Sequence, residues 1–468
     1  MRGKKFLVAG LGLTMLASMC SGCGKSEGST APSDSEHTSG TETVKTEAAG
    51  TETAAADSTG EEAASTGDLP YEGVTITFAK DTDSSSEGVE AVIALAKEKL
   101  GLNVELELIP GGAEGDNLIR TRLASGDMPD LQSYNSGSLF YALNPEEYFM
   151  DLTGESFIDT LDENFVKSTS VNGKPYGIPL FASQAGAIVY YKPIYEELNL
   201  DIPKTWDEFL ENCKKIKEAG KVAMIGTCAD SWTAQLIFFG DNYNALKKVP
   251  DFPEKFDAGE MKFATTPAMV ESFDKYADLI GYYNEDYLAA TYNDGCDMIA
   301  TGQGAHWPAL TQVLGNIANL YPDAIDDIGV FGIPGDDPDD VGLTLWMPNG
   351  IYANKNTENP DAVKAFMELY VSKDGLDAYC GKELPNGPVV VKDYVMPDNT
   401  YPAVKDDMMA YLNAGKTSPV LDNLVKVKGL ECPTICVECT TGELTGVEAA
   451  AAYDEDCKKQ AIQMGLDW

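Results

Sequence analysis

The sequence predicts an α/β protein whose folded part has two domains. Strand and helix periodicities alternate along the chain, and an early strand–helix–strand unit implies a parallel sheet. Residues 69–468 have normal apolar content and are numerous enough for two hydrophobic cores. Residues 1–68 differ in composition, so we expect both cores to lie after them.

The first 22 residues resemble a bacterial lipoprotein signal peptide. Basic residues at positions 2, 4 and 5 precede an apolar run over residues 6–19, which is too short to span a bilayer as a helix. Ser21 and Gly22 then precede Cys23, and the processing peptidase needs small residues before a lipidated cysteine. Cys20 departs from the pattern, which usually has Leu there. We predict lipidation of Cys23; cleavage to a soluble secreted protein is the alternative.

Residues 23–69 are predicted to be a disordered tether. Between residues 24 and 68 the chain has no aromatic residue and one large aliphatic residue, Val44. Such a stretch cannot bury enough apolar surface to offset the loss of chain entropy. A flexible tether of this length reaches about 35–40 Å, as a spacer across a cell wall or as a tolerated linker. The whole N-terminal region thus predicts an exported protein, held by lipid at the outer face of the cytoplasmic membrane.

Composition excludes several classes of function. The formal net charge of −41 argues against nucleic acid, whose phosphates require a basic surface. One of the two histidines lies in the tether, which leaves His306 alone and argues against histidine triads and multi-histidine metal sites. The cysteines beyond the signal region show no disulfide framework, and free thiols are equally compatible with their spacing. We expect no metal and no cofactor.

The first folded segment predicts a βαβ unit. Residues 74–79 form a buried strand, residues 89–100 have helical spacing that ends at Gly101, and residues 104–108 alternate as a strand does. The tip after the first strand, residues 81–86, is rich in Ser and Asp. Ligands in open α/β sheets lie beyond the carboxyl ends of strands, so this tip is a candidate wall of a site.

Turn and capping signals locate the later elements. We expect a helix over residues 117–125 that stops at Gly126, a strand after residue 130, a turn at residues 172–174 and a strand over residues 187–191. Four more helices are expected to begin at the capping box Thr205/Glu208, at Thr266-Pro267, at Asn359-Pro360 and at the capping box Thr445/Glu448. The apolar faces expected for the second and third of these helices are Val270, Phe273, Tyr276 and Ile280, and Val363, Phe366 and Tyr370.

Six short segments, in this order, resemble family 1 of the bacterial extracellular solute-binding proteins. They are ASGDMPD at 124–130, NGKPYGIP at 172–179, YYK at 190–192, PKTWDEF at 203–209, TGQGA at 301–305, and ANK at 353–355 with PDA at 360–362. The family usually has Tyr-Asn-Lys in the third segment, and often Ala-Met where Ala305-His306 stands. The second departure leaves open which position of the family the following Trp307 corresponds to.

The resemblance implies two α/β lobes joined by crossing strands, with a ligand in the cleft between them. This is the periplasmic-binding-protein-like fold, in which each lobe is discontinuous in sequence. We place lobe one at residues 70–184 plus 338–397 and lobe two at residues 185–337 plus 398–468. Closure of the lobes would exclude water and strengthen hydrogen bonds to the ligand.

A sugar has hydroxyls on its rim and apolar faces, so a site for it needs aromatic rings with short polar side chains around them. Trp206 belongs to a capping box and is interpreted as structural, whereas Trp232, Trp307 and Trp346 follow or precede Gly, Pro and polar residues where the family turns loops into the cleft. For each of these three, filling the core is the alternative. The polar and aromatic candidates beside them are Asp83, Tyr134, Gln184 and Asp230. A solvated loop charge is the alternative for the acids.

Two other motifs are interpreted as structural. Cys432, Cys436 and Cys439 have the spacing of a radical-SAM cluster motif, but they share one face of a helix, where small buried cysteines are the simpler interpretation. The aspartates at 326–327, 336–337 and 339–340 lack the spaced ligands and closing Glu of a calcium loop.

Three functions remain open from the sequence. The first is a monomeric substrate-binding lipoprotein that captures a sugar and delivers it to the permease subunits of an ABC importer. The second uses the same scaffold for a non-sugar solute or for a sensor kinase. The third, a glycoside hydrolase, requires two opposed carboxylates, and no motif selects such a pair among the many acids. We therefore expect no enzyme activity.

Overall fold

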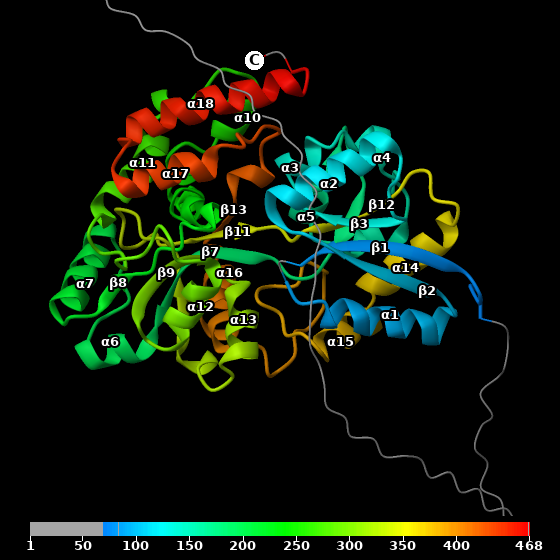
Figure 1. Cartoon of the computed structure of the whole chain (residues 1–468), viewed down its shortest axis with the longest axis horizontal. Helices are drawn as coiled ribbons and strands as arrows, with labels where there is room; N and C mark the ends of the chain where they lie inside the picture. Colours follow the sequence, from blue (N-terminus) through cyan, green and yellow to red (C-terminus); the bar gives the residue numbers. More distant parts are fainter. Residues whose placement is uncertain (1–68, 83, 467) are drawn as a thin grey trace, which may run out of the picture. The chain divides into compact units, whose positions relative to one another are not determined.

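Two mixed β-sheets flanked by helices carry the fold in the computed structural model, which describes residues 69–82, 84–466 and 468 (Figure 1). The α/β class predicted from the sequence is confirmed. We refer to each sheet with the helices packed on it as a lobe. The expected signal peptide, the tether, Cys23 and Asp83 lie outside the described residues.

The first lobe starts with the predicted βαβ unit. Strand β1 (Thr75–Asp81) pairs in parallel with β2 (Asn103–Ile109), and α1 (Glu87–Leu100) connects them. The helix ends at Gly101, whose φ of 73° lies in the left-handed region that favours glycine. The sheet order is β2-β1-β3-β12-β6, with β3 (Leu131–Tyr134) parallel to β1, and with β12 (Gly350–Ala353) antiparallel to both β3 and β6 (Gly177–Pro179).

The second sheet has the order β13-β11-β7-β9-β8, and β10 also pairs with β7. Its strands are β7 (Gln184–Tyr191), β8 (Val222–Met224), β9 (Gly304–Leu310), β10 (Ile328–Phe331), β11 (Leu343–Trp346) and β13 (Thr417–Pro419). The chain thus passes from the first sheet to the second between β6 and β7 and returns between β11 and β12. The expected lobe boundaries in residue numbers stay a prediction.

Helices cover both sheets. Those of the first lobe are α1, α2 (Gly112–Ser125), α3 (Ser138–Tyr141), α4 (Pro145–Tyr148), α5 (Glu163–Ser168), α14 (Pro360–Val371) and α15 (Lys373–Cys380). Those of the second lobe are α6 (Lys192–Leu198), α7 (Trp206–Glu218), α8 (Leu236–Gly240), α9 (Asn242–Lys248), α10 (Phe252–Asp257), α11 (Pro267–Leu279), α12 (Tyr292–Ala300), α13 (Val313–Leu320), α16 (Met409–Asn413), α17 (Cys432–Thr441) and α18 (Gly446–Gln463). Among the described residues, no helix is both long and apolar enough to cross a membrane.

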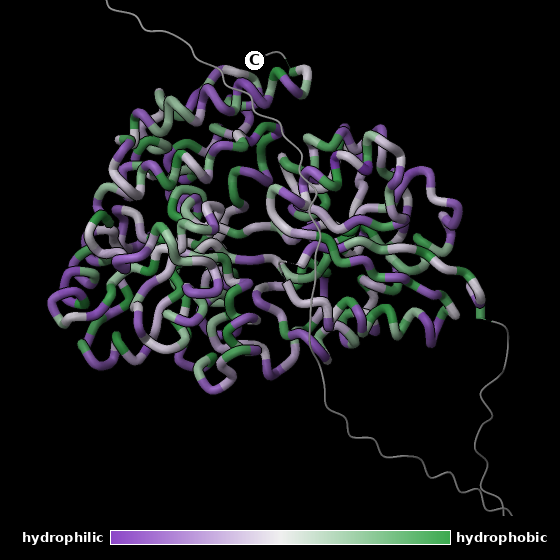
Figure 2. Tube along the Cα trace, viewed as in Figure 1, coloured by the Kyte–Doolittle hydropathy of each residue, from purple (hydrophilic) through white to green (hydrophobic). Residues whose placement is uncertain are grey.

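The outer helices are amphipathic. Figure 2 shows hydrophobic and hydrophilic residues alternating along α1, whose buried side includes Val89, Val92 and Ala96. The expected apolar face of α14 is confirmed, because Val363, Phe366 and Tyr370 are all buried there. The three cysteines of α17 are likewise buried on one face, as the structural interpretation of that motif predicted.

Three local expectations were wrong. Helix α2 begins at Gly112, five residues before the expected start at residue 117. Ile280 lies beyond the end of α11 and is 49% exposed, because Leu279 takes the buried position. At the start of α7, Thr205 accepts from the N–H of Glu208 as expected, but the Glu208 carboxylate accepts from the N–H of Lys204, so the box is not reciprocal.

Candidate ligand-binding site

Gln184 and Trp346 lie side by side where the second sheet meets the first lobe. They are register partners in the antiparallel pair β7–β11, and both are partly buried. The Trp346 ring covers Gly186: a Cβ there would lie 2.1 Å from the ring, so a larger residue would displace the indole. The structure therefore brings together two of the predicted site residues, and a glycine makes room for them.

A second group of predicted residues surrounds Tyr292. Its ring centroid lies 5.4 Å from that of Trp232 and 5.4 Å from that of Trp307. The carboxylate of Asp230 accepts a 2.6 Å hydrogen bond from the backbone N–H of Tyr292, which fixes the first turn of α12. Trp232 is partly buried, on the short helix η2 (Ser231–Gln235), whereas Trp307 on β9 is only 1% exposed.

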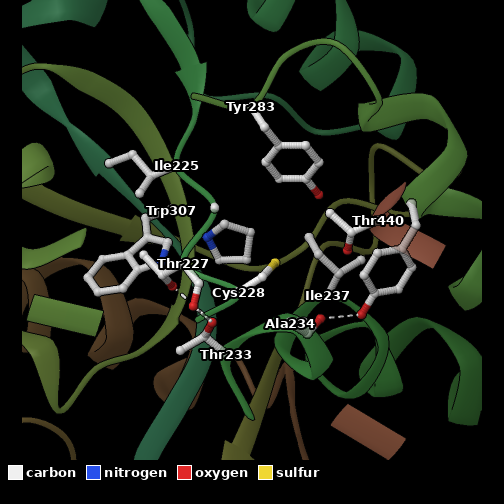
Figure 3. A pocket seen from close by; sticks show the side chains of 12 residues that line it. Ile225, Thr227, Cys228, Thr233, Ala234, Ile237, Tyr283, Trp307 and Thr440 are labelled. Atoms are coloured by element: carbon white, nitrogen blue, oxygen red, sulfur yellow. Dashed lines mark hydrogen bonds between the residues drawn. The ribbon is translucent and has the colours of Figure 1, made fainter. Parts of the chain in front are cut away.

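Trp307 also lines a small pocket inside the second lobe (Figure 3). Opposite the indole lie Cys228 and Tyr283, and the hydroxyls of Thr227 and Thr233 are joined by a 2.9 Å hydrogen bond. Burial raises the pKa of the Cys228 thiol to about 11, so the thiol is protonated at neutral pH and is a poor nucleophile. The residues that line this pocket suit a packed interior better than a catalytic centre.

Tyr134 ends β3 in the first lobe and is 3% exposed. Among the described residues its hydroxyl makes no hydrogen bond of good geometry, but the side chains of Asp116 and Arg120 of α2 lie close enough to interact with it. Burial raises the pKa of Tyr134 further above its usual value, with the charge of Asp116 adding to the effect. The Tyr134 hydroxyl thus lies among the charged side chains of α2 at the end of β3.

Lys80, which was not among the residues predicted from the sequence, holds the tip after β1 in place. Lys80 points its ammonium at the carbonyl oxygens of Asp81 and Ser84, both at 2.9 Å, and at the Ser84 hydroxyl at 3.0 Å. A lysine directly after Phe78 and Ala79, at the end of a strand expected to be buried, was the available signal. Lys80 thus sets the backbone path on either side of Asp83.

Tyr292 and Asn316 were also missed. Asn316 donates a 2.9 Å hydrogen bond to the Tyr292 hydroxyl and so orients the ring between the two tryptophans. Nothing in the local sequence marks either residue, because the contacts of Tyr292 come from η2, β9 and α13, which are far apart in the chain. Among the described residues, no group of three or more His, Cys, Asp or Glu side chains is placed to hold a metal ion.

The sequence matches a protein-family model described as bacterial extracellular solute-binding protein, over residues 79–376. The chain belongs to this family. Its members are binding proteins of ABC transporters and not enzymes, so the expectation of no enzyme activity is confirmed.

Individual relatives are distant in sequence. The multiple sugar-binding protein of Streptococcus mutans is 23% identical over 332 residues, which cover 68% of this chain and 76% of the relative. The melibiose/raffinose/stachyose-binding protein of Bacillus subtilis is 28% identical over 165 residues, 34% of this chain and 37% of the relative.

Solved structures share the fold of this solute-binding protein. A chitin oligosaccharide binding protein superposes with a TM-score of 0.70 at 21% identity, covering 85% of this chain and 100% of the other. RafE in complex with raffinose superposes with a TM-score of 0.67 at 20% identity, covering 82% and 99%. The two-lobe fold expected from the resemblance is confirmed.

Proposed function

We propose that this solute-binding protein captures an oligosaccharide between its lobes and delivers it to the permease subunits of an ABC importer. The observation that carries the proposal is the placement of Trp346 beside Gln184 at the junction of the sheets, an aromatic ring next to an amide that both donates and accepts hydrogen bonds. Relatives named for binding sugars support the ligand class.

The protein acts in this proposal as a monomer, anchored by lipid on Cys23 at the outer face of the cytoplasmic membrane. Its lobes comprise residues 70–184 plus 338–397 and residues 185–337 plus 398–468. The ligand-contacting set proposed from the sequence is Asp83, Tyr134, Gln184, Asp230, Trp232, Trp307 and Trp346; Trp307 is only 1% exposed, so the proposal depends on the other members. No cofactor or metal is involved, and neither nucleic acid nor a second protein chain is needed for binding.

The test uses tryptophan substitutions in the intact protein. Stacking on a sugar face buries apolar area worth roughly 1–2 kcal/mol per ring. Trp346→Ala and Trp232→Ala are therefore expected to weaken sugar binding about tenfold and to change the melting temperature little, because both rings are partly exposed. Affinity is measured by calorimetry with raffinose, stachyose and diacetylchitobiose.

Trp307→Ala provides the comparison. The side chain is 1% exposed, so its truncation is expected to cost about 3–5 kcal/mol of stability, with a smaller effect on affinity than on folding. If Trp346→Ala and Trp232→Ala keep the wild-type affinity, the sugar does not stack on these rings. If the wild type binds none of the three sugars but binds a peptide or polyamine in a thermal-shift screen, the non-sugar alternative replaces the proposal.

A further inference from the structure

The second lobe contains two buried Lys–Asp pairs that each lie beside an aromatic ring. Lys275 pairs with Asp241 at 3.5 Å, with side chains 10% and 3% exposed. Lys428 pairs with Asp422, and both of these side chains are 11% exposed. Each ammonium also lies over an aromatic ring, at 4.1 Å from the centroid of Trp206 for Lys275 and at 4.5 Å from that of Phe239 for Lys428. The two pairs can therefore be compared directly.

The first pair has its hydrogen bonds completed by the protein. Lys275 also donates to the carbonyl oxygen of Pro334 at 2.9 Å. The carboxylate of Asp241 accepts from the Ser272 hydroxyl and from the Asn244 amide, both at 2.7 Å. Such a network stabilises two buried charges within the fold, and it leaves little capacity for a ligand.

The second pair lacks such a network. Within the described part of the chain, the Lys428 ammonium donates only to Asp422, and the Asp422 carboxylate accepts only from Lys428. An ammonium has three donors and a carboxylate about four acceptor positions. Most of the donors of Lys428 and of the acceptor positions of Asp422 therefore have no partner in the described part of the protein. Both side chains are 11% exposed, so their remaining donors and acceptors face solvent, where a ligand could take the place of water.

The pair lies where the two lobes touch. It belongs to the segment that follows β13, which includes the short helix η6 (Leu421–Asn423), and this segment packs against the turn after β3 near α3 (Figure 1). Asn423 donates to the Ser136 hydroxyl at 3.2 Å, and a Cβ on Gly137 would lie 2.3 Å from the carbonyl oxygen of Asp422. From the first lobe, Asp116 on α2 interacts electrostatically with Lys428.

The same place adjoins the candidate site. The Lys428 ammonium lies over the face of the Phe239 ring. The Phe239 ring in turn packs edge-on against the Trp346 ring, with 6.5 Å between the ring centroids. The hydroxyl of Tyr134 also lies beside Asp116. Ligands in open α/β folds bind beyond the carboxyl ends of strands, and the turn after β3 is such an end.

We propose that Lys428 and Asp422 form a polar subsite that binds adjacent hydroxyl groups of an uncharged sugar. Lys428 donates to the oxygen of one hydroxyl, and Asp422 accepts the proton of its neighbour, while Trp346 flanks the sugar. The pair is neutral as a whole, and the opposite charges of Asp116 and Arg120 on α2 offset each other, which suits an uncharged ligand. This inference rests on the proposed function and extends it to the residues that select the ligand.

The experiment compares matched double variants. Lys428→Gln with Asp422→Asn removes the charges of the proposed subsite but keeps hydrogen-bonding side chains, and Lys275→Gln with Asp241→Asn does the same to the internal pair. The probe is whichever of raffinose, stachyose and diacetylchitobiose the wild type binds most tightly by calorimetry. We expect the first variant to lose affinity tenfold to a hundredfold, as for hydrogen bonds to charged groups. The second is expected to lower the melting temperature and keep the dissociation constant within about twofold.

Each result supports or overturns the inference. Wild-type affinity in a folded Lys428→Gln, Asp422→Asn variant overturns it and leaves the proposed function standing. Absence of binding of all three sugars by the wild type overturns both. If that double variant does not fold, Asp422→Asn alone is used, because it keeps an acceptor for Lys428. An affinity loss of at least tenfold in that single variant supports the inference, and an unchanged affinity overturns it.

Discussion

His306 illustrates how burial decides the chemistry of a single residue. The ring is fully buried between α6, α7 and the second sheet, with its Nε2 atom 2.8 Å from the Tyr195 hydroxyl. Burial lowers its pKa from 6.5 to about 3, so the imidazole is neutral at physiological pH. The only histidine beyond the tether is therefore a core residue.

This lowered pKa predicts a pH dependence of stability. Between pH 6.5 and pH 3 the unfolded chain binds the proton and the folded chain does not, so the free energy of unfolding falls as the pH falls through this window. From pH 6.5 to pH 5 the loss through this residue is about 2 kcal/mol, at 1.36 kcal/mol per pH unit. Urea unfolding of the wild type and of His306→Gln at several pH values measures it.

The comparison of slopes isolates the histidine, because the acidic groups contribute alike to both proteins. The variant is expected to be less stable at pH 7 and to show a shallower decline toward pH 5. Parallel curves for the two proteins would mean that His306 is protonated in the folded state.

At the scale of elements, two of the capping boxes predicted from the sequence had different outcomes. The box at the start of α18 is reciprocal: Thr445 accepts from the N–H of Glu448, and the Glu448 carboxylate accepts from the N–H of Thr445. The box at α7 is only half formed, because the chain before Thr205 turns so that Lys204 meets the Glu208 carboxylate instead. Local residue types suffice for a cap, but the direction of the incoming chain depends on distant packing.

Thr445→Ala is expected to destabilise the protein by about 1 kcal/mol, because the N–H of Glu448 loses its side-chain acceptor. Thr121→Ala is the matched control, since Thr121 lies exposed inside α2 and its hydroxyl donates only to the carbonyl oxygen of Asn117. There alanine is the better helix former, and stability should not fall. Chemical denaturation measures both, and equal losses at the two positions would contradict the capping argument.

At the scale of the whole molecule, the chain combines a two-lobe binding protein with an N-terminal region whose composition predicts a lipid anchor and a tether. We expect Cys23→Ser to release the protein into the medium, because a serine has no thiol to carry the lipid. Cys20→Ser should remain with the membrane fraction, since Cys20 precedes the expected cleavage point. Fractionation followed by immunoblotting distinguishes the two, and retention of Cys23→Ser would contradict the lipid anchor.

Patterns that depend on neighbours within a few residues were readable from the sequence. The βαβ unit, the stop of α1 at Gly101, the buried face of α14 and the order of the family segments all rest on local periodicity, capping and backbone preference. Hence the fold class and the family followed from the sequence, and so did the absence of a catalytic motif. The start of α2 and the position of Ile280 were misjudged because propensity alone does not locate a helix end.

The tertiary structure alone decided which residues meet. All three candidate tryptophans stand in similar local sequence, yet Trp307 is buried and Trp346 lies at the lobe junction, because burial depends on strands and helices far away in the chain. The sequence around the two lysine–aspartate pairs likewise does not show which pair is enclosed. Lys275 and Asp241 form further hydrogen bonds with Ser, Asn and a backbone carbonyl group, whereas Lys428 and Asp422, between the lobes, bond only to each other among the described residues. The partners that complete the hydrogen bonds of a charged pair come from distant parts of the chain, so local residue types and spacing do not reveal them.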